Sequence, residues 1–94
     1  PVTMDLPTRL REARAHVADL SARDLAELAG LSPSHITLIE SGRRPRVHAS
    51  TAAALCEVLG LSLDWLVSGK GPAPIPRRIR AAVETARRAR PRAA

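Results

Sequence analysis

The sequence predicts an all-α fold of short helices packed around an aliphatic core. The chain has 94 residues, which suits one small domain. Apolar residues make up 45% of it, yet it has no Phe, no Tyr and one Trp. Its core must come from Leu, Ile, Val and Ala, which favours close-packed helices over a β-sandwich. Four of the five glycines follow apolar-periodic segments, where glycine commonly ends a helix.

The first two helices are expected before residue 30. Apolar residues recur at helical spacing from about residue 7 to residue 17. They share one face: Leu6, Leu10, Ala13 and Val17. The second helix follows Ser21, and Asp24 three residues later makes a pattern close to a capping box. Gly30 ends this helix.

Three more helices are expected before residue 70. Ser32 and Pro33 predict an N-cap and a first-turn proline for the third helix. Ser62 marks the start of the fifth. Glycines end all three: Gly42, Gly60 and Gly69. Trp65 and Cys56 lie among apolar neighbours and are interpreted as core residues.

The composition changes after residue 69. Residues 69–76 contain three prolines and two glycines, which predicts a stiff, partly extended linker. A sixth helix follows, with a thin apolar stripe and arginines on its other faces, and Pro91 ends it. The stripe consists of Ile79, Ala82, Val83 and Ala86. The expected division is a domain over 1–69, a linker over 70–76 and a basic helix and tail over 77–94.

The net charge of +6 is concentrated in the tail. Residues 1–69 carry seven Arg against eight acidic residues, which gives −1. Residues 70–94 carry one Lys and seven Arg against one Glu, which gives +7. Such an excess suits an anionic partner such as nucleic acid or a membrane surface, and it also suits a solvated helix face.

The stretch from Asp24 to Gly42 has the pattern of a helix-turn-helix. Ala26 is small where the two helices would cross, and Gly30 makes the bend. Ile36 and Ile39 face inward, one helical turn apart. The second helix of such a motif protrudes, and its N-terminus fits the major groove of DNA.

These residues resemble the phage repressor and Cro-like helix-turn-helix family, often called the XRE family. The resemblance covers about residues 6–69 and includes LREAR in the first helix, IESG at the end of the third and LGLSLDWLVSG at the fifth. It implies a five-helix, lambda-repressor-like DNA-binding domain. It also implies that Arg14 and Glu40 pair, joining the first helix to the end of the recognition helix.

The resemblance implies a set of DNA-contacting residues. Ser32 would cap the recognition helix near a phosphate, and the loop arginines would contact the backbone. The implied residues are Ser32, Pro33, Ser34, Thr37, Leu38, Arg43, Arg44 and Arg46. This sequence adds Arg23 as a substitute backbone contact and His35 as a candidate outer contact, although a lone His is more often a polar surface residue. Ala22 stands where the family often has Gln, so one phosphate contact is expected to be missing. The groove-facing side chains are short or apolar, and none can make a bidentate contact to guanine or adenine.

Two functional hypotheses follow. The first is a small transcriptional repressor that binds a palindromic operator in double-stranded DNA as a homodimer, with Val47 and the end of the fifth helix at the dimer interface. The alternative is an antitoxin-type regulator whose C-terminal helix, within residues 75–90, binds a protein partner. No catalytic residues, cofactor or metal site are expected, because His16, His35 and His48 are scattered and Cys56 is alone. The sequence predicts a cytoplasmic protein without a membrane span.

Overall fold

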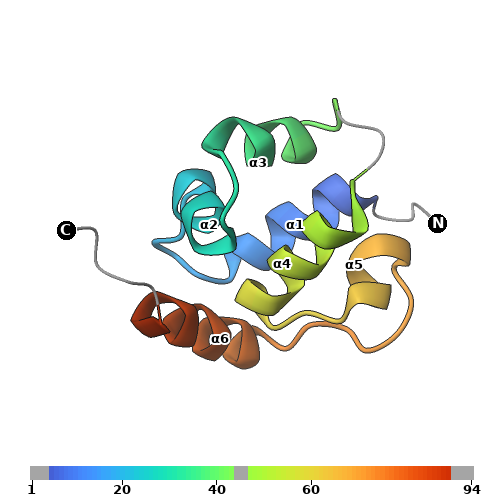
Figure 1. Cartoon of the computed structure of the whole chain (residues 1–94). Helices are drawn as coiled ribbons and strands as arrows, with labels where there is room; N and C mark the ends of the chain where they lie inside the picture. Colours follow the sequence, from blue (N-terminus) through green and yellow to red (C-terminus); the bar gives the residue numbers. More distant parts are fainter. Residues whose placement is uncertain (1–4, 44–46, 90–94) are drawn as a thin grey trace.

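The computed structural model describes residues 5–43 and 47–89, and this part of the chain forms six α-helices (Figure 1). They are α1 (Leu6–Ala15), α2 (Ala22–Ala29), α3 (Pro33–Glu40), α4 (Ala49–Leu59), α5 (Leu63–Ser68) and α6 (Pro76–Ala89). No strand occurs within these residues. The prediction of an all-α fold is confirmed.

One aliphatic core joins all six helices. Its fully buried large side chains are Leu10, Leu25, Ile36, Ile39, Leu55, Leu59, Leu66, Ile79 and Val83. Trp65 is 8% exposed and belongs to the same cluster, as predicted. Cys56 is also buried, and its burial raises the pKa of the thiol. α4 lies at the centre of this arrangement and contacts α2, α5 and α6.

α1 is shorter than the apolar spacing predicts. It ends at Ala15, and Val17 lies beyond it although its side chain is buried. The amides of His16, Val17 and Leu20 each donate to a carbonyl three residues earlier, so the chain continues as tight turns. Such turns bring every third residue to nearly the same side, as a helix does. Apolar spacing therefore cannot distinguish these tight turns from a continuation of α1.

The helix starts follow the predicted signals in part. Ser21 and Asp24 form a reciprocal capping box at the start of α2. Asp5, which the sequence analysis did not single out, caps α1 by accepting a hydrogen bond of 3.0 Å from the Thr8 amide. α6 begins at Pro76, one residue before the expected start, with proline at the first helical position. The predicted end at Pro91 lies outside the described residues.

α6 packs on α4 and belongs to the same core as the preceding helices. Ile79 and Val83 are 0% and 1% exposed, so its apolar stripe is covered by the protein's own helices. Gly60 allows this close contact, because a Cβ there would lie 2.9 Å from the Ala82 Cβ. The division at residue 69 remains a proposal about roles, in which residues 1–69 contact DNA and residues 77–94 supply a basic helix.

Candidate nucleic-acid interface

The turn between α2 and α3 sets the position of the candidate recognition helix. Gly30 adopts a left-handed conformation with φ +74°, and the Leu31 amide donates to the Ala26 carbonyl at 2.8 Å. This pattern ends α2 and redirects the chain within three residues. Ala26 and Ile36 are 0% exposed at the crossing, so the two helices pack closely. The expected helix-turn-helix geometry is confirmed.

α3 lies at one end of the molecule, at the top of Figure 1, with its outer side turned away from the other helices. Pro33, Ser34 and Thr37 are exposed there, as the resemblance implies for residues that face a groove. His35 and Leu38 are half-buried. These two residues therefore offer a smaller fraction of their surface to a ligand than the three exposed residues do.

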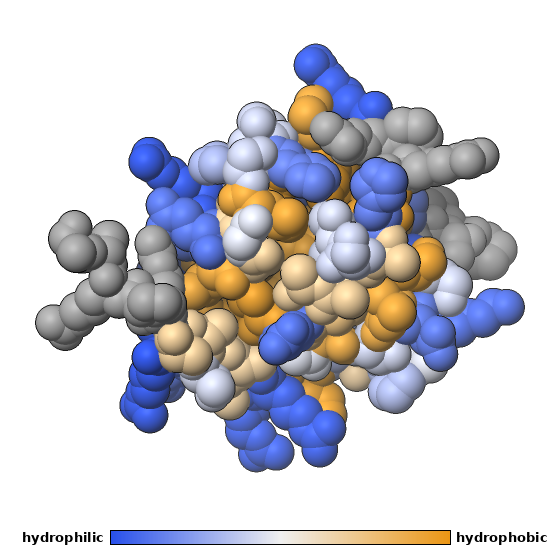
Figure 2. Space-filling view, in the orientation of Figure 1, coloured by the Kyte–Doolittle hydropathy of each residue, from blue (hydrophilic) through white to orange (hydrophobic). Residues whose placement is uncertain are grey.

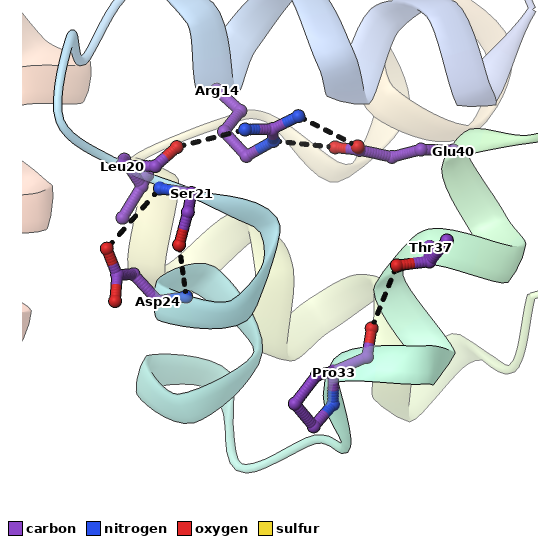
Figure 3. A network of polar contacts seen from close by, with 7 residues as sticks. All are labelled: Arg14, Leu20, Ser21, Asp24, Pro33, Thr37 and Glu40. Atoms are coloured by element: carbon purple, nitrogen blue, oxygen red, sulfur yellow. Dashed lines mark hydrogen bonds and ion pairs between the residues drawn. The ribbon is translucent and has the colours of Figure 1, made fainter.

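The hydroxyl groups along α3 bond to one another or to the helix backbone. The Thr37 hydroxyl donates to the Pro33 carbonyl at 3.2 Å (Figure 3). The Ser41 hydroxyl donates to the Leu38 carbonyl at 2.9 Å. A base contact by Thr37 would use the remaining lone pairs of its hydroxyl or its methyl group.

The prediction that the Ser32 side chain caps α3 is wrong. Ser32 occupies the N-cap position, but its hydroxyl lies 3.3 Å from the Ser34 hydroxyl and makes no capping bond. The reason is local: the Ser32 hydroxyl lies against Ser34, and the His35 amide, which could have bonded to that hydroxyl, donates to the Ser32 carbonyl at 3.0 Å. The α3 N-terminus thus has no side-chain cap, which suits a phosphate acceptor.

Two of the four predicted backbone-contacting arginines lie in the described residues. Arg23 is exposed at the start of α2, and its Nε lies 3.7 Å from the Glu27 carboxylate. Arg43 is exposed just beyond α3, and its amide donates to the Ser41 hydroxyl at 3.4 Å. Arg44 and Arg46 lie outside the described residues. The DNA contacts of all four remain predictions.

Arg14 and Glu40 form the pair that the resemblance implies. The guanidinium donates to both carboxylate oxygens at 2.8 and 2.9 Å and to the Leu20 carbonyl at 3.0 Å (Figure 3). The Glu40 side chain is 9% exposed and that of Arg14 is 25% exposed. The hydrogen bonds to Glu40 raise the pKa of the Arg14 guanidinium. One side chain thereby links α1, the turn before α2 and the end of α3.

Sequence reasoning missed a buried arginine. Arg9 is 5% exposed, and its guanidinium donates to the carbonyls of Leu66 and Val67 at 2.9 and 3.0 Å. These carbonyls belong to the last turn of α5, which contains no basic residue of its own. A cation at a helix C-terminus is favourable, so Arg9 fastens α1 to α5. The absence of a basic residue within residues 63–69 was the available signal.

A family model described as "Helix-turn-helix domain" matches residues 5–68. Because this match spans more than half of the chain, the chain belongs to this family of helix-turn-helix domains. It is a DNA-binding protein of the helix-turn-helix class, and domains of this kind are typically not enzymes. Searches of curated proteins and of solved structures returned no match.

Two further observations concern the described residues. None of their helices is both long and apolar enough to cross a membrane. Residues 5–43 and 47–89 also contain no group of three or more His, Cys, Asp or Glu side chains that could hold a metal ion.

Proposed function

We propose that this protein is an XRE-type transcriptional repressor that binds a specific operator in double-stranded DNA through α3. The observation that carries the proposal is the exposed outer face of α3, held at one end of the molecule by the Arg14–Glu40 pair. A helix presented in this way can enter the major groove, where base pairs are distinguishable. Its uncapped N-terminus and Arg43 would contact phosphates on either side.

The side chains of α3 favour readout through short contacts. Ser34 and Thr37 carry hydroxyl groups that bond to several bases, and the Thr37 methyl suits a thymine methyl. No long bidentate reader occurs among the exposed residues of α3. We therefore expect modest discrimination per half-site, which makes a second half-site necessary for useful specificity.

A homodimer would supply that second half-site. Leu63 and Val67 lie four residues apart on α5 and are 44% and 51% exposed, although both are apolar. Val47 is half-buried beyond α3. We propose these residues for the dimer surface. Val47 and Val67 belong to the expected regions, whereas Leu63 at the start of α5 is an addition. Two recognition helices would then meet one face of a palindromic site.

The antitoxin-type alternative is not favoured. It needs the apolar stripe of α6 to be available to a protein partner. Ile79 and Val83 are instead buried in the core, so the partner would have to displace part of the fold.

Selection of bound sequences from a random DNA pool tests the proposed function. We expect the full chain to enrich a palindromic motif. Thr37→Ala should enrich an altered motif, because a groove-facing side chain is changed. Absence of any enriched motif with the full chain would overturn the operator proposal. A motif without two-fold symmetry would overturn the homodimer.

Thr85→Ala is the matched control for this substitution. Thr85 is exposed on α6, and its hydroxyl donates to the Ala81 carbonyl four residues earlier at 3.0 Å, as Thr37 does to Pro33. Both substitutions therefore remove the same group and the same kind of helix bond. We expect Thr85→Ala to enrich the wild-type motif. An altered motif in both variants would mean that Thr37 does not act through DNA contact.

A further inference from the structure

Most of the net positive charge belongs to the C-terminal segment that contains α6, and α6 lies away from the recognition helix. Residues 1–69 carry a net charge of −1, whereas residues 70–94 carry +7. Figure 1 places α3 at the top of the molecule and α6 at the bottom, and α6 packs on α4 between them. Figure 2 shows long hydrophilic side chains projecting along the lower edge, where Figure 1 draws α6. A duplex bound to the outer face of α3 would therefore lie on the opposite side of the molecule from α6.

The arginines at the start of α6 have no acidic partner among the described residues. Arg77, Arg78 and Arg80 are exposed, and none lies within 4.0 Å of a described carboxylate. The arginines at the end of the same helix differ. Arg87 lies 3.4 Å from Asp19, and Arg88 lies 2.7 Å from Glu84. We call Arg77, Arg78 and Arg80 the α6 arginine cluster.

The position of this cluster disfavours a purely structural role. The first turn of α6 contains no acidic residue, although the positive end of the helix dipole lies there. Three cations in and beside this turn repel the dipole and one another. An arrangement that weakens its own helix is explained if an anion binds there.

We propose that the α6 arginine cluster binds the phosphate backbone of a second DNA duplex, so that one protein molecule joins two duplexes. This inference rests on the proposed function, because the first duplex is the one held by α3. The guanidinium groups would neutralise phosphates without reading bases. The second contact is therefore expected to be independent of sequence and sensitive to salt.

DNA fits this surface better than an acidic protein does. Protein interfaces contain an apolar or aromatic centre, whereas phosphate contacts need only cations and polar groups. The large apolar side chains of α6, Ile79 and Val83, are buried. The exposed residues of α6 are arginine, alanine, glutamate and threonine with the leading proline. Within α6, this composition offers charge without a large exposed apolar side chain.

Capture of a second duplex tests the proposal. A duplex carrying the selected site is fixed to beads, and the full chain is added with a fluorescent duplex of unrelated sequence. We expect the wild type to capture the fluorescent duplex at low salt and to release it as salt rises to about 0.2 M. The variant Arg77→Gln/Arg78→Gln/Arg80→Gln should capture roughly tenfold less, since about three phosphate contacts are lost. Its affinity for the fixed site should change by less than about threefold.

The matched control removes the same charge from elsewhere. Arg11→Gln/Arg87→Gln/Arg88→Gln also loses three arginines, and these have partners in Thr8, Asp19 and Glu84. We expect its capture to remain within about twofold of wild type. Gln and Arg have similar helix propensities, so circular dichroism should show the same helix content for both variants.

Several outcomes would overturn the inference. Equal loss of capture in both variants would mean that only net charge matters. Parallel loss of capture and of affinity for the fixed site would place the cluster on the first duplex. Undiminished capture by the cluster variant would mean that other residues join the two duplexes. If the wild type captured no second duplex, the proposal would be wrong, and an acidic protein would be the better candidate partner for this surface. Capture by wild type without any sequence preference on the first duplex would overturn the operator proposal alone.

Discussion

Arg14 shows how one side chain can hold the recognition helix in place. Glu40 lies at the C-terminal end of α3, where a negative charge is unfavourable for the helix dipole. The bidentate bonds from Arg14 offset this, and the third bond, to the Leu20 carbonyl, ties the same guanidinium to the entrance of α2. The orientation of α3 relative to α1 therefore depends on this pair as well as on Ile36 and Ile39.

We expect the Arg14–Glu40 pair to contribute strongly to the free energy of unfolding. Glu40→Ala leaves the Arg14 guanidinium without its carboxylate in a partly buried site. We expect a loss of about 3 kcal/mol in the free energy of unfolding, because breaking one side of a buried pair leaves an uncompensated charge. Urea denaturation of the variant and of wild type measures this difference.

Glu84→Ala is the control for this prediction. It breaks the Arg88–Glu84 pair, whose side chains are 79% and 64% exposed. Surface pairs of this spacing contribute little, so we expect a change below about 0.5 kcal/mol. If Glu40→Ala cost no more than Glu84→Ala, the Arg14–Glu40 pair would have to be considered a surface pair.

At the scale of helices, glycines perform two different tasks. Gly30 and Gly60 both end a helix with a left-handed conformation, at φ +74° and +63°. Gly30 faces open space, since a Cβ at this position would have no neighbouring atom within 4 Å, whereas a Cβ on Gly60 would meet α6. Gly30 is therefore required only for its backbone conformation. Gly60 is required for its backbone conformation and also for the close packing of α6.

Alanine substitutions should separate these two tasks. Gly30→Ala is expected to cost about 1–2 kcal/mol, the usual penalty for a side chain in the left-handed region. Gly60→Ala should cost about 1–3 kcal/mol more, because its Cβ would lie 2.9 Å from the Ala82 Cβ and 3.4 Å from the Arg78 carbonyl oxygen. Thermal or urea unfolding of the two variants gives the comparison. Equal losses would show that α6 moves aside at no measurable cost.

At the scale of the whole molecule, α6 is part of the folded core while its outer face supplies charge. Ile79 and Val83 are buried among residues of the preceding helices, and the arginines project from the same helix. Deleting residues 72–94 would therefore remove core and charge together. Substitutions on the outer face are the cleaner way to separate the function of the basic segment from stability.

The contribution of α6 to stability can be measured with one pair of variants. Ile79→Ala removes a side chain that is 0% exposed, and we expect it to cost about 2–5 kcal/mol through the cavity that it leaves. Ile75→Ala makes the same change at a side chain that is 44% exposed, just before α6, and should cost less than about 1 kcal/mol. The two unfolding free energies should differ clearly. Similar small losses would mean that residues 1–69 fold independently of α6.

Local signals account for the parts of this protein that could be predicted. Gly30, Gly60 and Gly69 end helices in left-handed conformations, and Ser21 with Asp24 starts α2 with a capping box, since these effects involve neighbouring residues only. The predictions that were wrong, the length of α1 and the Ser32 cap, also relied on local signals that more than one local structure can satisfy. Residues 16 and 17 satisfy helical spacing in tight turns, and the Ser32 hydroxyl bonds to Ser34 rather than to the backbone.

The sequence by itself determined the helical composition, the position of the helix-turn-helix and the uneven distribution of charge. These depend on spacing, capping and composition, all of which can be counted along the chain. Only the tertiary structure decided that Arg9 connects α1 to α5, that α6 completes the core, and that α6 lies on the opposite side of the molecule from α3. Each of these joins residues far apart in sequence, and which distant surfaces meet depends on the packing of all six helices together.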